Sequence, residues 1–213
     1  GGMEYPMLVT AGAGPTPESG GFMGGGAAGL EMLIAHEAGH QWWQSVAAFN
    51  EVEEPWLDEG LTDYATARLM LKKYGTDPQA LAAGRYGNAY VDRRRAAFLR
   101  NPDLPMYGQA WEFRSGDYVI AAYAKPALAL LTLEAVIGED EMLGILQTFY
   151  RRYRFAHPTT ADLRRTAEAE TDHDLSWFFD GLVYGEATLD YAARGIDAGS
   201  ITLAREIGRA SCR

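Results

Sequence analysis

The sequence predicts a mainly α-helical protein with a small β region, an α+β fold class. Apolar residues recur at three- and four-residue steps along most of the chain, which is the period of a helix. Strand-like residues gather in one short run near the beginning. Of the 213 residues, 47% are hydrophobic and 23% are charged, so the chain can bury a core, and no Pro/Ser-rich linker divides it. We therefore expect one domain.

The first predicted element is a short strand from Glu4 to Thr10, in which Pro6 favours an edge position. Residues 11–29 hold many of the glycines and are expected to form most of a loop. These glycines are not expected to bind phosphate, because no P-loop Lys-Ser/Thr pair follows them.

The rest of the chain is expected to be largely helical. Pro55 and Pro126 suit the first turn of a helix, and Gly75 and Gly138 suit the position after the last turn. Residues 76–117 are less regular, because prolines interrupt them. Helices are expected over 30–47, 55–74, 126–137, 139–155, 160–170 and 174–183.

The charge of the chain limits its partners. A net charge of −10 and a pI near 4.9 argue against a nucleic-acid or anionic-membrane partner, because phosphate contacts need clustered Lys and Arg. The short basic run from Arg93 to Arg95 is interpreted as a solvated helix face. The best apolar run, Ala127 to Ile137, is shorter than the roughly 18 residues that span a bilayer. No transmembrane segment is expected.

The end of the chain looks unnatural. Residues 206–213 match the translation of a common sequencing-adapter oligonucleotide, so we interpret them as a non-native tail and residues 1–205 as the domain fragment. Cys212 is the only cysteine and lies in this tail. Disulfide and thiolate chemistry are therefore not expected.

A metal-binding pattern lies inside the predicted helix over 30–47. His36-Glu37-Ala38-Gly39-His40 is an H-E-x-x-H sequence, and residues four apart lie on one helix face, so His36 and His40 can bind one ion. Glu59, on the next predicted helix, supplies the third ligand that a tetrahedral catalytic zinc needs. The alternative is that both histidines are ordinary core or capping residues. The His/His/carboxylate set favours zinc, as one ion.

Four segments of the chain, in this order and at these separations, resemble the aminopeptidase N family of gluzincin zinc metallopeptidases. The resemblance implies a thermolysin-like metallopeptidase catalytic domain. It also implies that the family's amino-terminal β-domain and carboxy-terminal helical domain lie outside this fragment. The four segments are Gly1-Gly2-Met3-Glu4, His36 to His40, Trp56-Leu57-Asp58-Glu59-Gly60 and Tyr123-Ala124-Lys125.

The resemblance also implies a role for each matched residue. Zinc is bound by His36, His40 and Glu59, and Glu37 takes a proton from the zinc-activated water as general base. The hydroxyl of Tyr123 stabilises the oxyanion that forms during peptide hydrolysis. On its own, Tyr123 would be read as an aromatic core residue.

Glu4 decides which peptides are expected to be substrates. In the family its carboxylate binds the free α-ammonium of the substrate, which implies an aminopeptidase acting on peptides with a free N-terminus. The backbone of Gly1, Gly2 and Met3 is expected to hold the substrate by strand addition. The family's Asn after this glutamate is Tyr5 here, which affects the positioning of the substrate backbone. The alternative is that Glu4 is merely a polar residue on an edge strand.

Three further positions carry expectations. Asp63 lies four residues after Glu59 and is expected to accept the other ring N–H of a zinc-bound histidine, with a solvated helix charge as the alternative. Asp58 and Pro126 replace the family's common Asn and Gly, and neither is expected to touch a metal ligand.

Two other functions stay open beside the aminopeptidase. A zinc endopeptidase or a related hydrolase could use the same site, and it would cleave N-terminally blocked peptides equally well. A non-catalytic binding module is disfavoured, because no ligand residue and no general base is missing.

Overall fold

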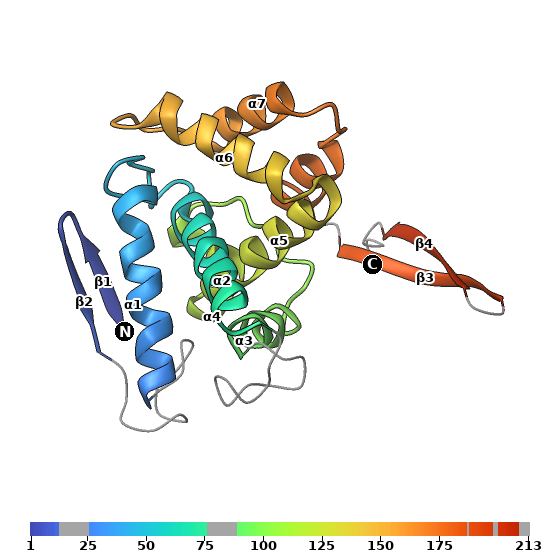
Figure 1. The fold of residues 1–213 in the computed structure, drawn as a ribbon, viewed down its shortest axis with the longest axis horizontal. Helices are drawn as coiled ribbons and strands as arrows, with labels where there is room; N and C mark the ends of the chain where they lie inside the picture. Colours follow the sequence, from blue (N-terminus) through green and yellow to red (C-terminus); the bar gives the residue numbers. More distant parts are fainter. Residues whose placement is uncertain (13–25, 76–88, 187, 198–199, 209–213) are drawn as a thin grey trace.

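The computed structural model describes residues 1–12, 26–75, 89–186, 188–197 and 200–208. It is mainly helical with two antiparallel two-stranded hairpins, which confirms the predicted fold class (Figure 1). The α-helices are α1 (Gly26–Trp43), α2 (Leu61–Tyr74), α3 (Ala89–Phe98), α4 (Ser115–Tyr118), α5 (Lys125–Ile137), α6 (Glu139–Tyr153) and α7 (Thr160–Glu170). Shorter turns are the π-helices η2 (Trp56–Gly60), η4 (Val119–Ala124) and η5 (Trp177–Val183) and the 3₁₀ helix η3 (Ala110–Glu112).

Several predicted helix ends agree with the structure, but the first helix spans Gly26–Trp43 rather than residues 30–47 and begins within the predicted loop. Gly75 and Gly138 follow α2 and α5 with φ angles of 61° and 97°, a conformation that glycine adopts without strain. The range predicted for α7 is the observed one, and its N-terminus is closed by a capping box between Thr159 and Asp162.

The prediction of a single strand over residues 4–10 is wrong, because this part of the chain forms a hairpin of two strands. Strand β1 (Gly2–Tyr5) pairs antiparallel with β2 (Leu8–Ala11), and Glu4 lies opposite Val9. Pro6 and Met7 form the turn, in which Met7 has a φ of 65°. Proline cannot donate a ladder hydrogen bond, so it ends the first strand rather than standing within it. The hairpin lies beside α1 (Figure 1).

Pro126 does not begin a separate helix, contrary to the prediction. Elements α4, η4 and α5 form one continuous helix from Ser115 to Ile137. Proline removes the hydrogen bond to the carbonyl four residues earlier, that of Ala122, and the helix absorbs this loss in the wider π-helical turn η4. Gly60 packs against this place: a Cβ atom there would lie 2.5 Å from Cβ of Pro126. The helix segment carrying Glu59 thus approaches α5 closely.

The same continuous helix bears on the expectation that no segment spans a membrane. Among the described residues, the helix Ser115–Ile137 is long enough and apolar enough to span a membrane, judged by length and composition alone. Its most apolar window is 61% buried within the molecule, as in the core helix of a folded domain.

Helix α3 was not expected, because residues 76–117 contain helix-breaking prolines. It brings Tyr90 and Arg94 into the interior, where they are 0% and 1% exposed. The interpretation of Arg93 to Arg95 as a solvated face is therefore wrong for Arg94. A buried arginine needs a buried acid, and the primary sequence does not show which acid is near.

The main core joins the helix segment before α2 to α5, α6, α7 and η5. Trp56 is fully buried there, and its indole N–H donates to the hydroxyl of Thr160, 2.9 Å away, so η2 is fixed to the start of α7. The buried members of this core include Trp56, Leu57, Leu61, Tyr64, Leu130, Leu133, Ile145, Phe149, Leu163, Phe178, Phe179 and Val183.

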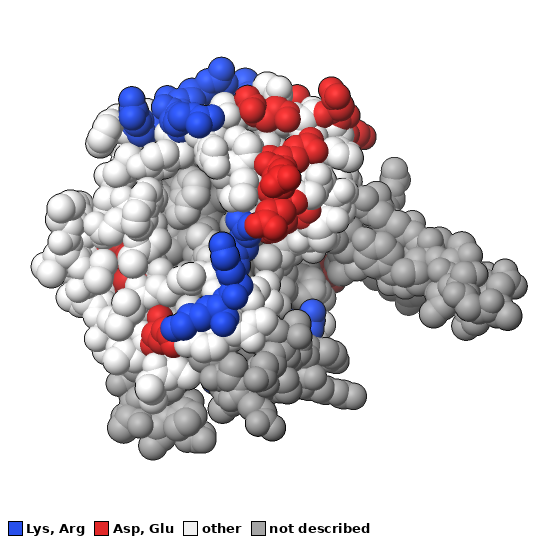
Figure 2. Space-filling model, viewed as in Figure 1, with Lys and Arg blue, Asp and Glu red and all other residues white. Residues whose placement is uncertain are grey.

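Two further features complete the fold. Strands β3 (Thr188–Asp197) and β4 (Ser200–Gly208) form a second antiparallel hairpin, whose last residues, 206–208, belong to the segment predicted to be a non-native tail. Residues 209–213 lie outside the described residues. On the helical body, Figure 2 shows acidic and basic side chains close together on one face. In α6 the first turn is acidic and the last turn is basic, an order that interacts favourably with the helix dipole.

Candidate metal centre

The three predicted metal ligands converge where α1 meets η2. The two histidine Nε2 atoms lie 3.1 Å apart. Glu59 Oε2 lies 3.1 Å from Nε2 of His36 and 3.2 Å from Nε2 of His40. Both histidines are buried, with exposed fractions of 3% and 0%. The structure therefore brings together three ligand atoms from two segments of the chain.

This triangle fits a zinc ion. Ligand bonds of about 2.0–2.1 Å in a tetrahedron separate the ligand atoms by about 3.3 Å, close to the spacing seen here. Two ring nitrogens that point at each other without a proton between them would repel, whereas a cation between them is bound by both. Three protein ligands also leave the fourth position for water or substrate.

A carboxylate oxygen lies within about 3 Å of each of the opposite ring nitrogens. His36 Nδ1 lies 3.0 Å from Oδ1 of Asp63, the contact expected from helix geometry. His40 Nδ1 lies 2.6 Å from Oδ1 of Asp58. The expectation that Asp58 touches no metal ligand is wrong, because η2 turns this side chain back towards α1. With a carboxylate oxygen beside each Nδ1 atom, both Nε2 atoms are available to a metal.

The electrostatics of the centre favour a cation. Burial lowers the pKa of His36, but its contacts with Asp63 and Glu59 outweigh burial and raise this pKa to about 9. Burial opposes the charge of His40 too, yet Asp58 and Glu59 raise its pKa to about 11. Burial raises the pKa of Glu59, and the two histidines more than reverse this and lower it to about 2. The surrounding carboxylates thus stabilise positive charge at the histidines.

Glu37 lies beside the ligands with one free oxygen. Its side chain is buried, and Oε2 has no hydrogen-bond partner among the described residues. Burial also raises the pKa of Glu37, although His36 and His40 oppose this. The carboxylate packs against Gly2, where a Cβ atom would lie 2.2 Å from Glu37 Oε1. Gly2 therefore leaves space that Glu37 occupies.

Tyr123 reaches the same centre from η4. Its ring stacks on that of His36 at 5.8 Å between centroids, and its hydroxyl donates a hydrogen bond to Oε1 of Glu59. Burial and the nearby Glu59 raise the pKa of Tyr123, so the phenol keeps its proton. Tyr118, one turn earlier, contacts the Tyr123 ring edge-on at 6.0 Å and was not predicted as part of the site.

Glu4 joins the site from β1. Its carboxylate, that of Glu37 and a ring nitrogen of His40 place ligand atoms within 4.8 Å of one another. Oxygens of Glu4, Glu51 and Asp58 form a second such group. Glu51 was missed in the sequence, because it lies in an irregular loop with no motif around it. The centre is therefore lined by more carboxylates than a single metal requires.

The other residues of the first motif have backbone partners. The amino group and carbonyl of Gly1 pair with Gly12 at 2.9 and 3.0 Å, and Met3 lies opposite Thr10 in the hairpin. One edge of this short strand is thus already paired.

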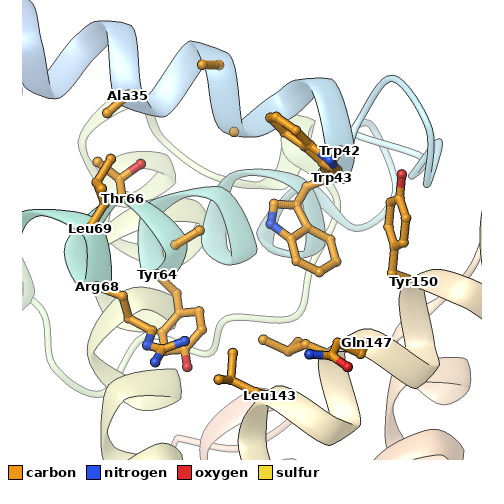
Figure 3. Close-up of a pocket in the computed structure, with 14 residues that line it drawn as sticks. Ala35, Trp42, Trp43, Tyr64, Thr66, Arg68, Leu69, Leu143, Gln147 and Tyr150 are labelled. Carbon is orange, nitrogen blue, oxygen red and sulfur yellow. The ribbon is translucent and has the colours of Figure 1, made fainter. Parts of the chain in front are cut away.

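A separate apolar groove lies on another face of α1. It has a volume of about 520 Å³ and is bounded by α1, α2 and α6, with Trp42, Trp43, Tyr64, Leu69, Leu143 and Tyr150 among its walls (Figure 3). None of the predicted metal ligands lines it, and Arg68 is its charged residue. The groove is not the metal centre.

Comparison with known proteins identifies the family. The model of the peptidase family M1 domain matches residues 27–182. Leukotriene A-4 hydrolase from Xenopus laevis is 26% identical over 167 residues, which are 78% of this chain and 26% of that protein. Aminopeptidase N from Streptomyces lividans is 24% identical over 149 residues, 67% of this chain and 17% of that protein. The chain thus spans about a quarter or less of these relatives.

Solved structures share the fold. An M1 zinc metallopeptidase from Deinococcus radiodurans superposes with a TM-score of 0.57 at 20% identity, over 75% of this chain and 34% of that one. A mutant two-domain M1 zinc metallopeptidase bound to L-tryptophan gives a TM-score of 0.59 at 22% identity, over the same shares. Zinc, predicted from the sequence, is the metal that these descriptions name. The family model covers most of the chain, including α1 and η2, and this chain therefore belongs to peptidase family M1.

Proposed function

We propose that this chain is the catalytic part of a zinc aminopeptidase, which removes the N-terminal residue of peptides. The observation that carries the proposal is the triangle formed by His36, His40 and Glu59, with the unpartnered oxygen of Glu37 beside it. A relative named aminopeptidase N and membership of family M1 support the same reaction class.

Zinc bound by the three ligands supplies Lewis-acid activation of a water molecule and of the substrate carbonyl. Glu37 is the general base: it accepts a proton from the attacking water and delivers it to the leaving amine. Its burial suits this task, because burial raises the pKa of Glu37 towards neutral pH. A carboxylate with a pKa near the working pH can both take and release a proton.

Tyr123 stabilises the charge that develops on the carbonyl oxygen. Its hydroxyl already lies at the ligand Glu59, so a small rotation redirects the donor from a carboxylate to an oxyanion in the same space. Because the oxyanion exists only after attack, this hydrogen bond lowers the barrier rather than strengthening substrate binding.

Glu4 and Glu51 hold the substrate's α-ammonium. Their carboxylate oxygens lie within 4.8 Å of each other and of an oxygen of Asp58, so the region next to the metal is strongly anionic. A free α-ammonium neutralises this charge, whereas an internal peptide bond would be desolvated there without compensation. We expect backbone groups of β1, from Gly2 to Glu4, to position the substrate chain by strand addition.

The decisive experiment compares the full chain with its Glu37→Gln variant, using a chromogenic amino-acid amide and zinc analysis. We expect equal zinc content and a loss of at least about 10²-fold in kcat for the variant. Retained activity would contradict the mechanism. A matched pair of peptides, free and N-acetylated, tests the specificity. Equal cleavage of both peptides would favour the endopeptidase alternative, and loss of cleavage on acetylation supports the aminopeptidase.

A further inference from the structure

Asp63 stands in the middle of a buried chain of polar contacts that ends on α3. Arg94 Nε donates to Asp63 Oδ2 and Arg94 Nη2 donates to Asp63 Oδ1, both at 2.6 Å. The hydroxyl of Tyr90 also donates to Oδ1, and it accepts a bond from Arg94 Nη2 at 2.7 Å. The guanidinium lies 3.9 Å from the centre of the Tyr90 ring. All three side chains are 1% exposed or less.

This arrangement fixes a carboxylate in space rather than merely neutralising it. A guanidinium fork that bonds to both oxygens sets the plane of the carboxylate as well as its position. Stacking on Tyr90 in turn restricts rotation of the fork. The oxygen that receives donors from both Arg94 and Tyr90 is Oδ1, the one that lies 3.0 Å from Nδ1 of His36.

We propose that Arg94 is a positioning residue for the metal ligand His36, acting through Asp63, and that helix α3 is thereby part of the zinc centre. The inference rests on the proposed zinc site. The hydrogen bonds of Arg94 described above go to Asp63 and Tyr90, so its effect on the metal ligand is transmitted through Asp63. It holds Asp63 so that the imidazole of His36 keeps its Nδ1–H towards α2 and its Nε2 towards the metal.

The other ligand histidine is supported differently, which gives an internal comparison. His40 Nδ1 is bonded to Asp58 and lies 3.2 Å from the hydroxyl of Thr62. Asp58 Oδ2 has no hydrogen-bond partner among the described residues. The two carboxylates beside the histidine Nδ1 atoms, Asp63 and Asp58, therefore differ in how firmly they are held, and loss of Arg94 should disturb His36 and leave His40 in place.

The coupling works in both directions. If Arg94 strengthens zinc binding through Asp63, zinc binding must stabilise the packing of α3 against α2 by the same free energy. Zinc should then slow amide hydrogen exchange in α3.

The experiment measures zinc affinity by competition with a chromophoric chelator in the full chain, together with thermal unfolding of the zinc-free protein. Arg94→Met is expected to weaken zinc binding about 10- to 100-fold, the range seen for groups that orient metal ligands. Arg94→Lys keeps the charge but loses the fork, so an intermediate loss is expected. Arg95→Met is the matched control, because Arg95 is the next residue of α3 with a side chain 44% exposed, and it should bind zinc normally.

A double-mutant cycle separates positioning from general damage to the fold. When Asp63→Ala is already present, adding Arg94→Met should cost little further zinc affinity, because no acceptor for Nδ1 of His36 remains for Arg94 to position. A full additional loss, or an Arg94→Met affinity within twofold of wild type, would overturn the proposal. If Arg94→Met does not fold, Arg94→Lys and Tyr90→Phe are measured in the same cycle with the same criteria. Zinc affinity is read without any substrate, so a wild-type protein that binds zinc but cleaves no peptide would refute the proposed function alone.

Discussion

At the scale of single residues, the proposed metal ligands have carboxylate neighbours that are not themselves proposed ligands. Asp58 stands where the aminopeptidase N family commonly has Asn, and it accepts from Nδ1 of His40 at 2.6 Å. An amide oxygen can accept the same hydrogen bond, so the geometry explains why either residue serves at this position.

This predicts how Asp58 variants behave. Asp58→Asn should keep zinc affinity within about threefold, because the acceptor remains, whereas Asp58→Ala should weaken it about tenfold or more. Chelator competition at neutral pH measures both. An equal loss in the two variants would mean that the negative charge, and not the hydrogen bond, is what His40 needs.

Gly2 is the second residue with a specific consequence. A methyl group at this position would overlap the carboxylate of Glu37, so Gly2→Ala should displace this proposed general base and reduce amide hydrolysis about 10²-fold while zinc content stays normal. Gly1→Ala is the control, because a Cβ atom at Gly1 meets nothing within 4 Å. Unequal zinc content between wild type and Gly2→Ala would show that the damage reaches the metal ligands.

At the scale of elements, the decisive contact is between η2 and the continuous helix that contains α5. Two irregular turns meet there: η2 carries Glu59, and η4 carries Tyr123. The absence of a side chain at Gly60 lets the two helices approach, and Pro126 occupies the space. Both a proposed metal ligand, Glu59, and the proposed oxyanion donor, Tyr123, are positioned by this one contact.

Gly60→Ala tests the contact. The added methyl group would lie 2.5 Å from the Pro126 ring and should lower the free energy of unfolding by about 1–3 kcal/mol, as other overpacked core sites do. Gly144→Ala, in α6 with open space around it, should instead raise this free energy by about 0.5–1 kcal/mol. Urea unfolding of both zinc-free variants provides the measurement. A neutral Gly60→Ala would show that the helices can separate without cost.

At the scale of the whole molecule, a buried lysine links stability to pH. Lys125 is 3% exposed, and its ammonium donates to the carbonyl of Leu104 at 2.8 Å, which fastens α5 to the loop after α3. Burial lowers the pKa of Lys125 to about 8. The Lys125 ammonium of the folded protein thus loses its proton at a lower pH than the same group in the unfolded chain does.

The sign of the pH effect follows from proton binding. Between pH 8 and about 10.4, the usual lysine pKa, the unfolded chain binds more protons at this residue than the folded protein does. The contribution of Lys125 to the free energy of unfolding should therefore rise with pH, by about 1–3 kcal/mol across this window. Urea unfolding at pH 7.5 and 10 for wild type and Lys125→Met isolates the residue. A difference between the two proteins that does not change with pH would contradict the prediction.

The sequence by itself determined the features that depend on short-range patterns. The spacing of His36 and His40 places both on one helix face, helix caps locate most helix ends, and Asp63 follows Glu59 by one helical turn. These relations span only a few residues, so the backbone periodicity decides them. The order of the four motifs in the chain also sufficed to indicate the family.

Only the tertiary structure decided which distant side chains meet. The structure alone shows that Pro6 starts a turn, that Pro126 lies inside a long helix, that Asp58 bonds to His40 and that Glu51 joins Glu4. Arg94 is the clearest case: its sequence neighbours suggest a solvated basic run, yet it is buried against an acid 31 positions away. Burial of such a charge is favourable only if packing supplies its partner, and packing depends on the whole chain rather than on local pattern.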